Sequence, residues 1–397
     1  MIYLDVTSAA ASPVNMGVQR TVRGLYAHLK NQHDVTPVRW DFFRKRYSRL
    51  SPREQNFLDH PFASYQGASA TPGLWDWNFF IENRKDAWSR KQRGLDHGTI
   101  LKAGNLLLIP DLCWDPRIHS WAGMAQFEGK KLAIFHDAMP LRIPGQADSH
   151  DALFKRYVDS LAHLDGVICI SQEVKEDLLR FWKESHLDLK PIEVIGWPVP
   201  FDEERPVNSP NQAARKIIYV SRLKLRKNHL VLFEACESLW KKGEKFSLDL
   251  IGIEDAFTDT RKILREMKRL AALGYPVQWR KHISNAELTQ AYRDCSFTVF
   301  PSRMEGFGLP IVESLWHGRP VICGKNGAIG EVSVGGGCYQ IDQNNPAELA
   351  AAIQLLLNDP AVYNQLYEET RLRAFRSWDD YGRDIDPVLR AEPASMR

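Results

Sequence analysis

The dominant pattern in this chain is an alternation of short apolar, β-rich runs with longer amphipathic stretches. The runs include NLLLIP, KLAIFHD, GVICIS and IEVIGWP in the first half, and KIIYVSR, FSLDLIG, FTVFPS and RPVICG in the second. Runs that are apolar on both faces suit parallel strands covered by helices, and the stretches between them, such as QEVKEDLLRFWKES, fit those helices. The alternation on both sides of the midpoint predicts an α/β protein with two doubly wound sheets.

The alternation lapses between Trp197 and Arg215. The segment WPVPFDEERPVNSPNQAAR contains four prolines and has neither a helical nor a strand period, which is typical of a linker. A chain of 397 residues is also long for a single hydrophobic core. We therefore expect two domains, residues 1–200 and 201–376, followed by a C-terminal tail at 377–397.

Composition and motif counts exclude several classes of protein. The net charge of +3 is too small to indicate nucleic-acid binding, and no apolar run approaches the roughly 18 residues of a membrane-spanning helix. The N-terminal MIYLDVTSAAASP meets Asp5 after four residues, so it reads as a first strand rather than a signal peptide. The six cysteines form no C-x-x-C pair, which favours buried free thiols in a reducing compartment and no zinc site. We expect a cytoplasmic protein.

Residues 40–98 are the least regular part of the chain. The stretches WDFFRKRYSRLSPR and FFIENRKDAWSRKQRG mix arginine and lysine with aromatic residues. One interpretation is a solvated excursion whose aromatic side chains fold inward. The other is a basic, aromatic surface that touches a large acceptor or the anionic lipid head groups of the inner membrane, where Lys and Arg are attracted.

The segment FPSRMEGFGLPIVESLWHG, from Phe300 to Gly318, predicts a strand, a glycine-rich turn and a short helix that starts near Pro310. In an open α/β sheet, ligands bind beyond the carboxyl ends of the strands. Free backbone N–H groups at a helix N-terminus favour phosphate, and Gly306 and Gly308 have no side chain to block its approach.

Two glutamates flank this turn. Glu305 is expected at the strand end, and Glu313 in the first turn of the helix, so that each reaches a different part of one ligand. A nucleotide sugar has a hydroxyl-rich group at each end and a diphosphate between them, which matches carboxylates at the ends and amides in the middle. The alternative is that both are ordinary helix-start charges that interact with the dipole.

This segment resembles the E-x7-E signature of the retaining glycosyltransferases of GT-B fold, in particular the large family four. The similarity covers roughly residues 297–360 and continues through GAIGEV and YQIDQNNPAELAAAIQLLLNDP. The resemblance implies two Rossmann-like domains with a cleft between them, an N-terminal domain for the acceptor and a C-terminal domain for the donor. It also places Phe307 and Leu309 with Gly306, Gly308 and Glu313 among the donor-binding residues.

The stretch YVSRLKLRKNHLVLFEA resembles the segment of that family whose arginine and lysine bind the donor diphosphate, here Arg222 and Lys227. Two cations neutralise the leaving phosphate, so that no metal ion is required. Ser221 stands where the family commonly has glycine. In VQWRKHISNAEL, Lys281 stands where a glycine close to the nucleobase is usual, so the identity of the base stays open.

The N-terminal half carries weaker similarities. AIFHDAMPLRIP resembles a segment in which His136 would face the donor sugar, with Asp137 available to orient the imidazole. SPVNMGVQRTVRGLYAHL resembles an early loop and helix in which Gly17 would begin the helix and take part in donor binding. Ser171 is expected to be a helix cap.

The C-terminal segment FRSWDDYGRDIDPVLR resembles the last helices of the family, which cross back to the N-terminal domain. Its Asp384 and Asp386 form a D-x-D pair, but they lie in a tail and not after a core strand, so we interpret the pair as incidental.

The resemblance as a whole implies a hexosyltransferase that is retaining and metal-independent, needs no cofactor, and uses a nucleotide-diphosphate sugar and a glycan or lipid-linked oligosaccharide. GDP-mannose is the first choice of donor, before a dTDP- or UDP-sugar. A nucleotide-sugar epimerase of the same fold and a non-catalytic two-lobed binding protein remain alternatives. A dinucleotide-dependent oxidoreductase is disfavoured, because VTSAAASP after the first strand offers no G-x-G-x-x-G.

Overall fold

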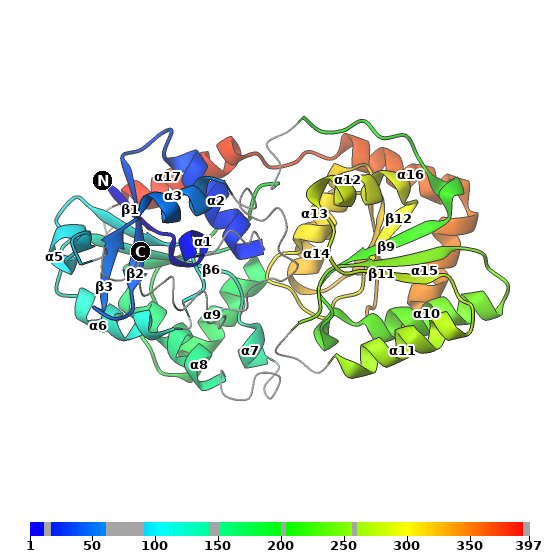
Figure 1. Cartoon of the computed structure of the whole chain (residues 1–397), viewed down its shortest axis with the longest axis horizontal. Helices are drawn as coiled ribbons and strands as arrows, with labels where there is room; N and C mark the ends of the chain where they lie inside the picture. The colour runs from blue at the N-terminus through cyan, green and yellow to red at the C-terminus, as the bar shows by residue number, and fades with distance from the viewer. Residues whose placement is uncertain are drawn as a thin grey trace. The chain divides into compact units, whose positions relative to one another are not determined.

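The computed structural model describes residues 1–11, 17–60, 91–113, 115–142, 151–199, 204–255 and 260–391. The chain divides into two compact units. The first unit contains residues 1–144, 148–200 and 376–397, and the second contains residues 145–147 and 201–375. Each unit is built on its own sheet (Figure 1). Within the basic, aromatic stretch 40–98, residues 61–90 lie outside the described residues.

The sheet of the first unit has the strand order β4-β3-β2-β1-β5-β6-β7-β8. In the run β2-β1-β5-β6-β7-β8 each strand is parallel to its neighbours. Strand β3 is antiparallel to both β2 and β4. Their bounds are β1 (Ile2–Asp5), β2 (Val35–Asp41), β3 (Arg46–Arg49), β4 (Gly94–Leu95), β5 (Leu106–Ile109), β6 (Lys130–Phe135), β7 (Gly166–Cys169) and β8 (Ile192–Val194).

The sheet of the second unit is parallel throughout, with the order β11-β10-β9-β12-β13-β14. Strands β10 and β11 follow β9 on one side of the sheet, and β12, β13 and β14 follow on its other side. The strand order therefore reverses between the neighbours β9 and β12. The bounds are β9 (Lys216–Val220), β10 (Ser247–Ile251), β11 (Val277–Arg280), β12 (Phe297–Phe300), β13 (Val321–Gly324) and β14 (Cys338–Ile341).

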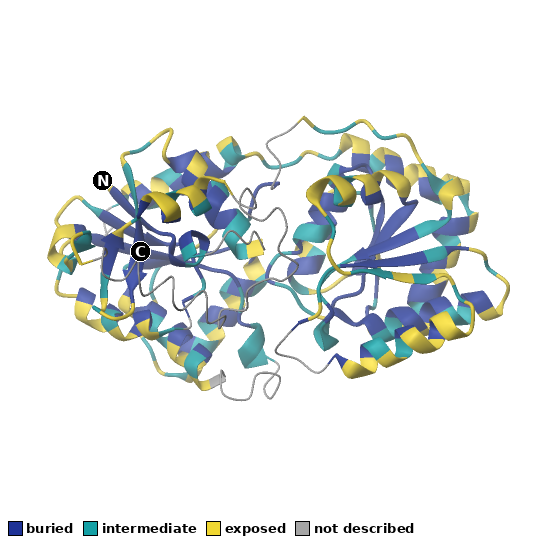
Figure 2. Cartoon of the chain, in the orientation of Figure 1, coloured by how far each residue is buried: buried dark blue, intermediate teal, exposed yellow. Residues whose placement is uncertain are grey.

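Helices cover the sheets, and the strands form the buried layer of each unit (Figure 2). In the second unit α10 and α11 lie on one face of the sheet, and α12 and α13 on the other (Figure 1). Its helices are α10 (His229–Lys241), α11 (Arg261–Ala272), α12 (Asn285–Asp294), α13 (Leu309–Trp316), α14 (Gly327–Ser333), α15 (Pro346–Asn358) and α16 (Pro360–Leu372). This alternation of strands with covering helices confirms the predicted α/β class.

The first unit contains α1 (Thr7–Ala11), α2 (Gly17–Leu29), α3 (Pro52–Asp59), α5 (His97–Ile100), α6 (Trp121–Met124), α7 (Met139–Arg142), α8 (Asp151–Ser160), α9 (Gln172–Glu184) and α17 (Trp378–Arg390). Ser171 caps α9 by accepting from the Val174 N–H, as the sequence predicts. Helix α17 packs closely on α2, because a Cβ at Gly24 would lie 2.1 Å from the Trp378 ring.

The aspartates of the D-x-D pair lie in α17 and form ion pairs within the first unit. Asp384 pairs with Arg376, and Asp386 with His33 at 2.8 Å. These contacts agree with an incidental origin for the motif.

All six cysteines are free thiols, and all but Cys338 are buried. Within the described ranges, no helix combines the length and the apolar character that crossing a membrane would need.

Candidate active site

The carboxyl ends of β9 and β12 lie side by side where the strand order of the second unit reverses. Loops that leave such a pair of strands separate to opposite faces of the sheet and leave room for a ligand. Here they carry the predicted diphosphate residues Arg222 and Lys227 after β9, and Glu305 after β12. The structure therefore brings together residues that lie 78 positions apart in sequence, as Lys227 and Glu305 do.

Glu305 is the centre of this site. Its Oε1 accepts hydrogen bonds from the Lys227 ammonium and the Ser302 hydroxyl, both at 2.5 Å, and lies 3.0 Å from the Arg226 guanidinium. Burial alone would raise the pKa of Glu305, but Arg226 and Lys227 lower it to about 2. Within the described residues these contacts all converge on Oε1, so Oε2 is the oxygen available to accept from a ligand hydroxyl.

Lys227 is buried, with a side chain that is 10% exposed, and its ammonium lies 5.0 Å from the centre of the Phe300 ring. Burial lowers its pKa to about 8, although the Glu305 carboxylate acts in the opposite direction. Repulsion from Arg226 contributes to this lowering. The ammonium is therefore poorly solvated, and a bound anion would stabilise its charged form.

Arg226 is a site residue that the sequence analysis missed. Its guanidinium also donates to the Met304 carbonyl at 2.8 Å, and its own carbonyl accepts from the Arg303 N–H at 2.9 Å. Arg226 thus connects the loop after β9 to the loop after β12 at both of its ends. Its position next to Lys227 in the sequence is the one local indication that Arg226 belongs to the site. Only the strand order shows that the loop with Arg226 lies against the loop with Glu305.

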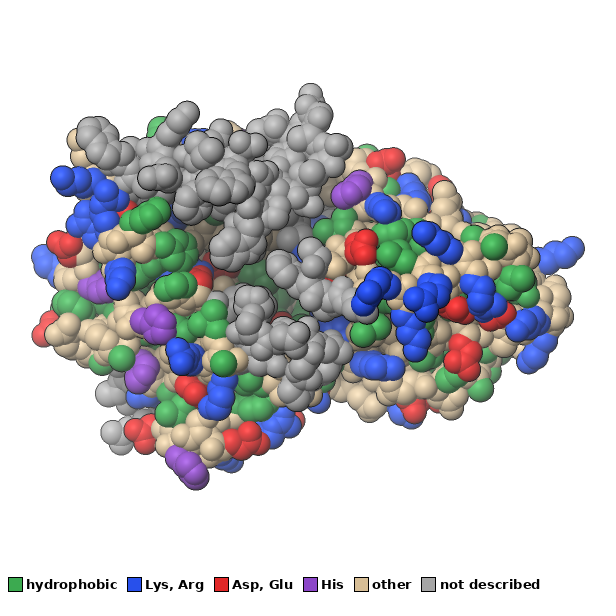
Figure 3. Space-filling view, turned by 60° about the horizontal axis from the view of Figure 1, so that its bottom comes forward, with side chains coloured by type: hydrophobic (Ala, Val, Ile, Leu, Met, Phe, Trp, Pro, Cys, Tyr) green, Lys and Arg blue, Asp and Glu red, His purple; other side chains and the backbone are tan. Residues whose placement is uncertain are grey.

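Arg222 and Lys224 form the second charged group of the same loop. Both pair with the buried Asp255, at 3.6 Å and 2.9 Å. Together with the Glu305 group, four cations face two carboxylates, so these six groups leave an excess of two positive charges. That excess matches a diphosphate, whose two negative charges would neutralise it. Figure 3 shows Lys and Arg side chains, with Asp and Glu among them, on one face of the second unit (right), without identifying those of this site.

The turn before α13 has the predicted glycine-rich geometry. Gly308 is the N-cap of α13 with φ +114°, a left-handed conformation that other residues rarely adopt, and it brings no capping side chain. Pro310 lies in the first turn, and the helix ends just before Gly318. Gly306 is buried, while Phe307 and Leu309 are half-buried. The helix N-terminus therefore follows Glu305 after a turn of three residues, as the sequence predicts for a phosphate site.

The expected position of Glu313 is wrong in one respect. Because α13 begins at Leu309, Glu313 is its fifth residue and lies beyond the first turn. Its side chain is buried, and its Oε2 accepts from the Tyr292 hydroxyl at 3.2 Å. Tyr292 in turn stacks on His317. The carboxylate is thus held by a buried protein partner, which the local sequence could not reveal.

His136 and Gly17 belong to the first unit. His136 directly follows β6, is buried, and its Nε2 lies 2.7 Å from the Pro110 carbonyl, so Nε2 donates. Burial lowers the pKa of His136, which keeps the imidazole neutral near pH 7. The hydrogen bond that orients the ring therefore runs to Pro110, whereas Asp137 accepts from the Met139 N–H. Gly17 begins α2 and is exposed.

The first unit contains a second charged network, which the sequence did not predict. It lies where the strand order of that sheet reverses, between β1 and β5. Arg117 is 2% exposed and donates to Asp5 at 2.9 Å, to Asp111 at 3.4 Å and to Asp115 at 2.6 Å. Asp111 also accepts from the backbone and the hydroxyl of Ser8. This buried network fixes the loop that contains Pro110, the partner of His136.

The titration of Lys227 leads to a first prediction. On the expectation that Lys227 binds the donor diphosphate, kcat/KM for transfer should fall about tenfold per pH unit above pH 8, because the ammonium is then lost. Arg226→Gln should move this decline to higher pH, because it removes a neighbouring positive charge. Initial rates between pH 6 and pH 10 (about the range in which lysine titration is visible) test both statements. An unchanged decline in Arg226→Gln would contradict the assignment.

Comparison with known proteins finds relatives among glycosyltransferases. Residues 200–373 match the family model of the glycosyl transferases group 1. A serotype-specific mannosyltransferase WbdA of Escherichia coli is 26% identical over 252 residues, which cover 58% of this chain and 30% of the relative. A poly(glycerol-phosphate) alpha-glucosyltransferase of Bacillus subtilis is 26% identical over 232 residues, 58% of this chain and 32% of the relative. The chain thus spans about a third of the length of the curated relatives it matches.

Solved structures share the fold of the whole chain. Sucrose-phosphate synthase from Thermosynechococcus elongatus aligns with a TM-score of 0.66 at 19% identity, over 98% of both chains. The Anabaena protein HepE, crystallised with UDP and glucose, aligns with a TM-score of 0.64 at 16% identity, also over 98% of both. The chain therefore has the GT-B fold, and its residues 200–373 are similar to the glycosyl transferases group 1 family.

Proposed function

We propose that this protein is a retaining, metal-independent hexosyltransferase that uses a nucleotide-diphosphate sugar. The observation that carries the proposal is the group of Arg226, Lys227 and Ser302 around Glu305, beside the N-terminus of α13. It supplies surplus positive charge and backbone N–H groups for a diphosphate, and a carboxylate oxygen for sugar hydroxyls. In this proposal residues 201–376 bind the donor and residues 1–200 bind the acceptor.

The mechanism we infer is attack of the acceptor hydroxyl on the same face of the sugar that the diphosphate leaves. The C1–O bond to the phosphate breaks, a bond from C1 to the acceptor oxygen forms, and the departing phosphate oxygen takes the acceptor proton. Arg222, Lys227 and the helix N-terminus stabilise the negative charge that develops. In this proposal Glu305 holds sugar hydroxyls and Glu313 the ribose, and His136, with its neutral ring, is the catalytic residue of the first unit.

Among donors we favour GDP-mannose, because the WbdA relatives are named as mannosyltransferases. A UDP- or dTDP-sugar is the next candidate, since HepE was crystallised with UDP. For the acceptor we propose a glycan or lipid-linked oligosaccharide of a cell-surface polysaccharide, such as O-antigen or capsule, assembled on the cytoplasmic side of the inner membrane. Gly17, Gly306, Phe307, Gly308 and Leu309 complete the proposed donor site.

A thermal-shift screen of sugar nucleotides in EDTA tests the proposal. A donor that binds the folded state raises the melting temperature by mass action, and without a metal ion the shift should remain. We expect GDP-mannose to give the largest shift and Lys227→Ala to lose it. The absence of a shift with every sugar nucleotide would contradict the proposal.

Incubation of the hit without acceptor then separates the alternatives. A transferase leaves the sugar configuration unchanged, and an epimerase changes it. A binding protein would give the thermal shift but no transfer when a glycan acceptor is supplied.

A further inference from the structure

The turn between β2 and β3 exposes two adjacent aromatic side chains. Phe42 is 44% exposed and Phe43 is 64% exposed. The turn that carries them is well defined, because the buried Asp41 carboxylate accepts from the N–H groups of Phe43 and Arg44 and from the Arg44 guanidinium. We call residues 41–46 the hairpin tip. Its apolar side chains are thus held outward by a fixed backbone.

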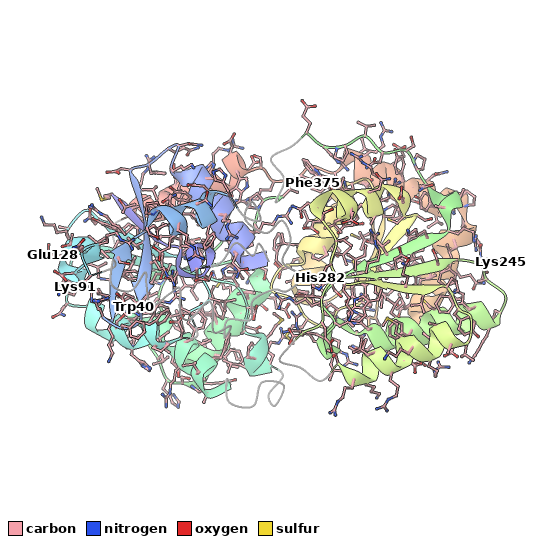
Figure 4. The ribbon with its side chains drawn as sticks, in the orientation of Figure 1. Trp40, Lys91, Glu128, Lys245, His282 and Phe375 are labelled. Carbon is pink, nitrogen blue, oxygen red and sulfur yellow. The ribbon has the colours of Figure 1, made fainter. Side chains whose placement is uncertain are left out.

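Basic residues follow these two rings closely in the sequence. The stretch 41–49 contains four cations, Arg44, Lys45, Arg46 and Arg49, against the single carboxylate of Asp41. Lys45 and Arg49 are exposed, whereas Arg44 pairs with Asp41, and Arg46 pairs with Asp96 at 3.5 Å and donates to the Lys91 carbonyl at 3.1 Å. Figure 4 labels Lys91, and also Trp40 at the end of β2. An aromatic pair amid net positive charge matches the anionic head-group region of a bilayer, which offers both an apolar layer and negative charge.

The sheet register places the hairpin tip at the same edge as His136. Val38 of β2 is level with Asp5 of β1, and β2 continues to Asp41 at the carboxyl end. His136 follows β6, which runs parallel to β2 and is separated from it by β1 and β5. Three strand spacings amount to roughly 14 Å. The tip therefore lies at the same edge of the sheet as His136, within the domain that the proposed function assigns to the acceptor.

We propose that the hairpin tip docks the first unit on an anionic lipid bilayer, with Phe42 and Phe43 entering the head-group layer. A lipid-linked acceptor anchored in the same bilayer would then reach the His136 edge with its glycan. The inference rests on the proposed function for the identity of the acceptor, but not for the binding to lipid. An anionic bilayer is favoured over a free glycan, because a neutral glycan offers no negative charge for the basic residues beside the two phenylalanine rings.

Vesicle co-sedimentation of the full chain tests the docking. Wild-type protein should bind vesicles of phosphatidylglycerol and phosphatidylcholine, bind pure phosphatidylcholine weakly, and release at high salt. Phe42→Ser/Phe43→Ser should lower the partition coefficient about tenfold or more. Lys45→Glu/Arg49→Glu should remove the preference for anionic lipid. The matched control is Val207→Ser/Leu372→Ser, which removes two exposed apolar side chains of the second unit and should bind as the wild type does.

Two further measurements keep the docking separate from the proposed function. Donor-induced thermal shifts of Phe42→Ser/Phe43→Ser should equal those of the wild type, which also shows that the variant is folded. Equal vesicle binding by this variant and the wild type would overturn the inference, as would binding that ignores lipid charge. A raised KM for a soluble glycan acceptor with unchanged vesicle binding would assign the tip to glycan contact instead. If no sugar nucleotide shifts the melting temperature, the proposed function is contradicted but the docking on lipid is not.

Discussion

Lys227→Ala should lower kcat/KM for transfer by a factor of about a hundred to a thousand, the usual effect of removing one well-placed group that stabilises developing negative charge. The structure gives the reason. The Lys227 ammonium is kept in a poorly solvated position, where burial lowers its pKa to about 8. A cation that is poorly stabilised in the free enzyme gains most when the diphosphate becomes more negative as the bond to the sugar breaks.

The fold should survive this substitution. Removing Lys227 leaves Glu305 with the Arg226 guanidinium at 3.0 Å and the Ser302 hydroxyl, so its carboxylate stays compensated. Initial rates with the donor varied at fixed acceptor measure the effect, and the melting temperature shows whether the variant is folded. Lys241→Ala is the matched control, because this exposed lysine pairs with Glu237 on its own helix. Wild-type turnover in Lys227→Ala would place the diphosphate elsewhere.

The sequence predicts those features of the site that depend on short stretches of chain. The apolar run that ends at Phe300, followed by two glycines and Pro310, predicts β12, the turn and α13, because strand end, left-handed turn and helix start each have local residue preferences. Ser171 is predicted as a cap for the same reason. The α/β class follows from the repeated alternation of apolar and amphipathic stretches.

Features that depend on strand order could not be predicted. Arg226 matters because β9 and β12 are neighbours, and no local pattern shows that the loop after one lies against the loop after the other. Arg117 and Asp5, 112 positions apart, meet for the same reason across β1 and β5. The partner of Glu313 is also non-local, since Tyr292 comes from the preceding helix α12.

Glu305→Gln should destabilise the second unit by about 3 kcal/mol at pH 7, because removing one partner of a largely buried ion pair leaves its charge uncompensated. Here two cations would remain, Arg226 and Lys227, whose side chains are only 15% and 10% exposed. The variant should also lose transfer, since the amide keeps the shape of Glu305 but not its charge. Urea unfolding of both proteins gives the difference in free energy of unfolding. Glu368→Gln, an exposed glutamate, is the control.

The pH dependence distinguishes this electrostatic cause from simple loss of packing. The folded-state pKa of Glu305, about 2, lies below its usual value of 4.5, so its contribution to stability is complete above pH 4.5 and is lost as pH falls towards 2. The difference between wild type and Glu305→Gln should therefore shrink in acid. It should also shrink above pH 8, where Lys227 loses its proton. Adding Arg226→Met to Glu305→Gln should restore part of the stability, because one uncompensated cation is then gone. A difference that stays constant from pH 3 to pH 9, about the span of both titrations, would show that the carboxylate does not hold this pair of cations together.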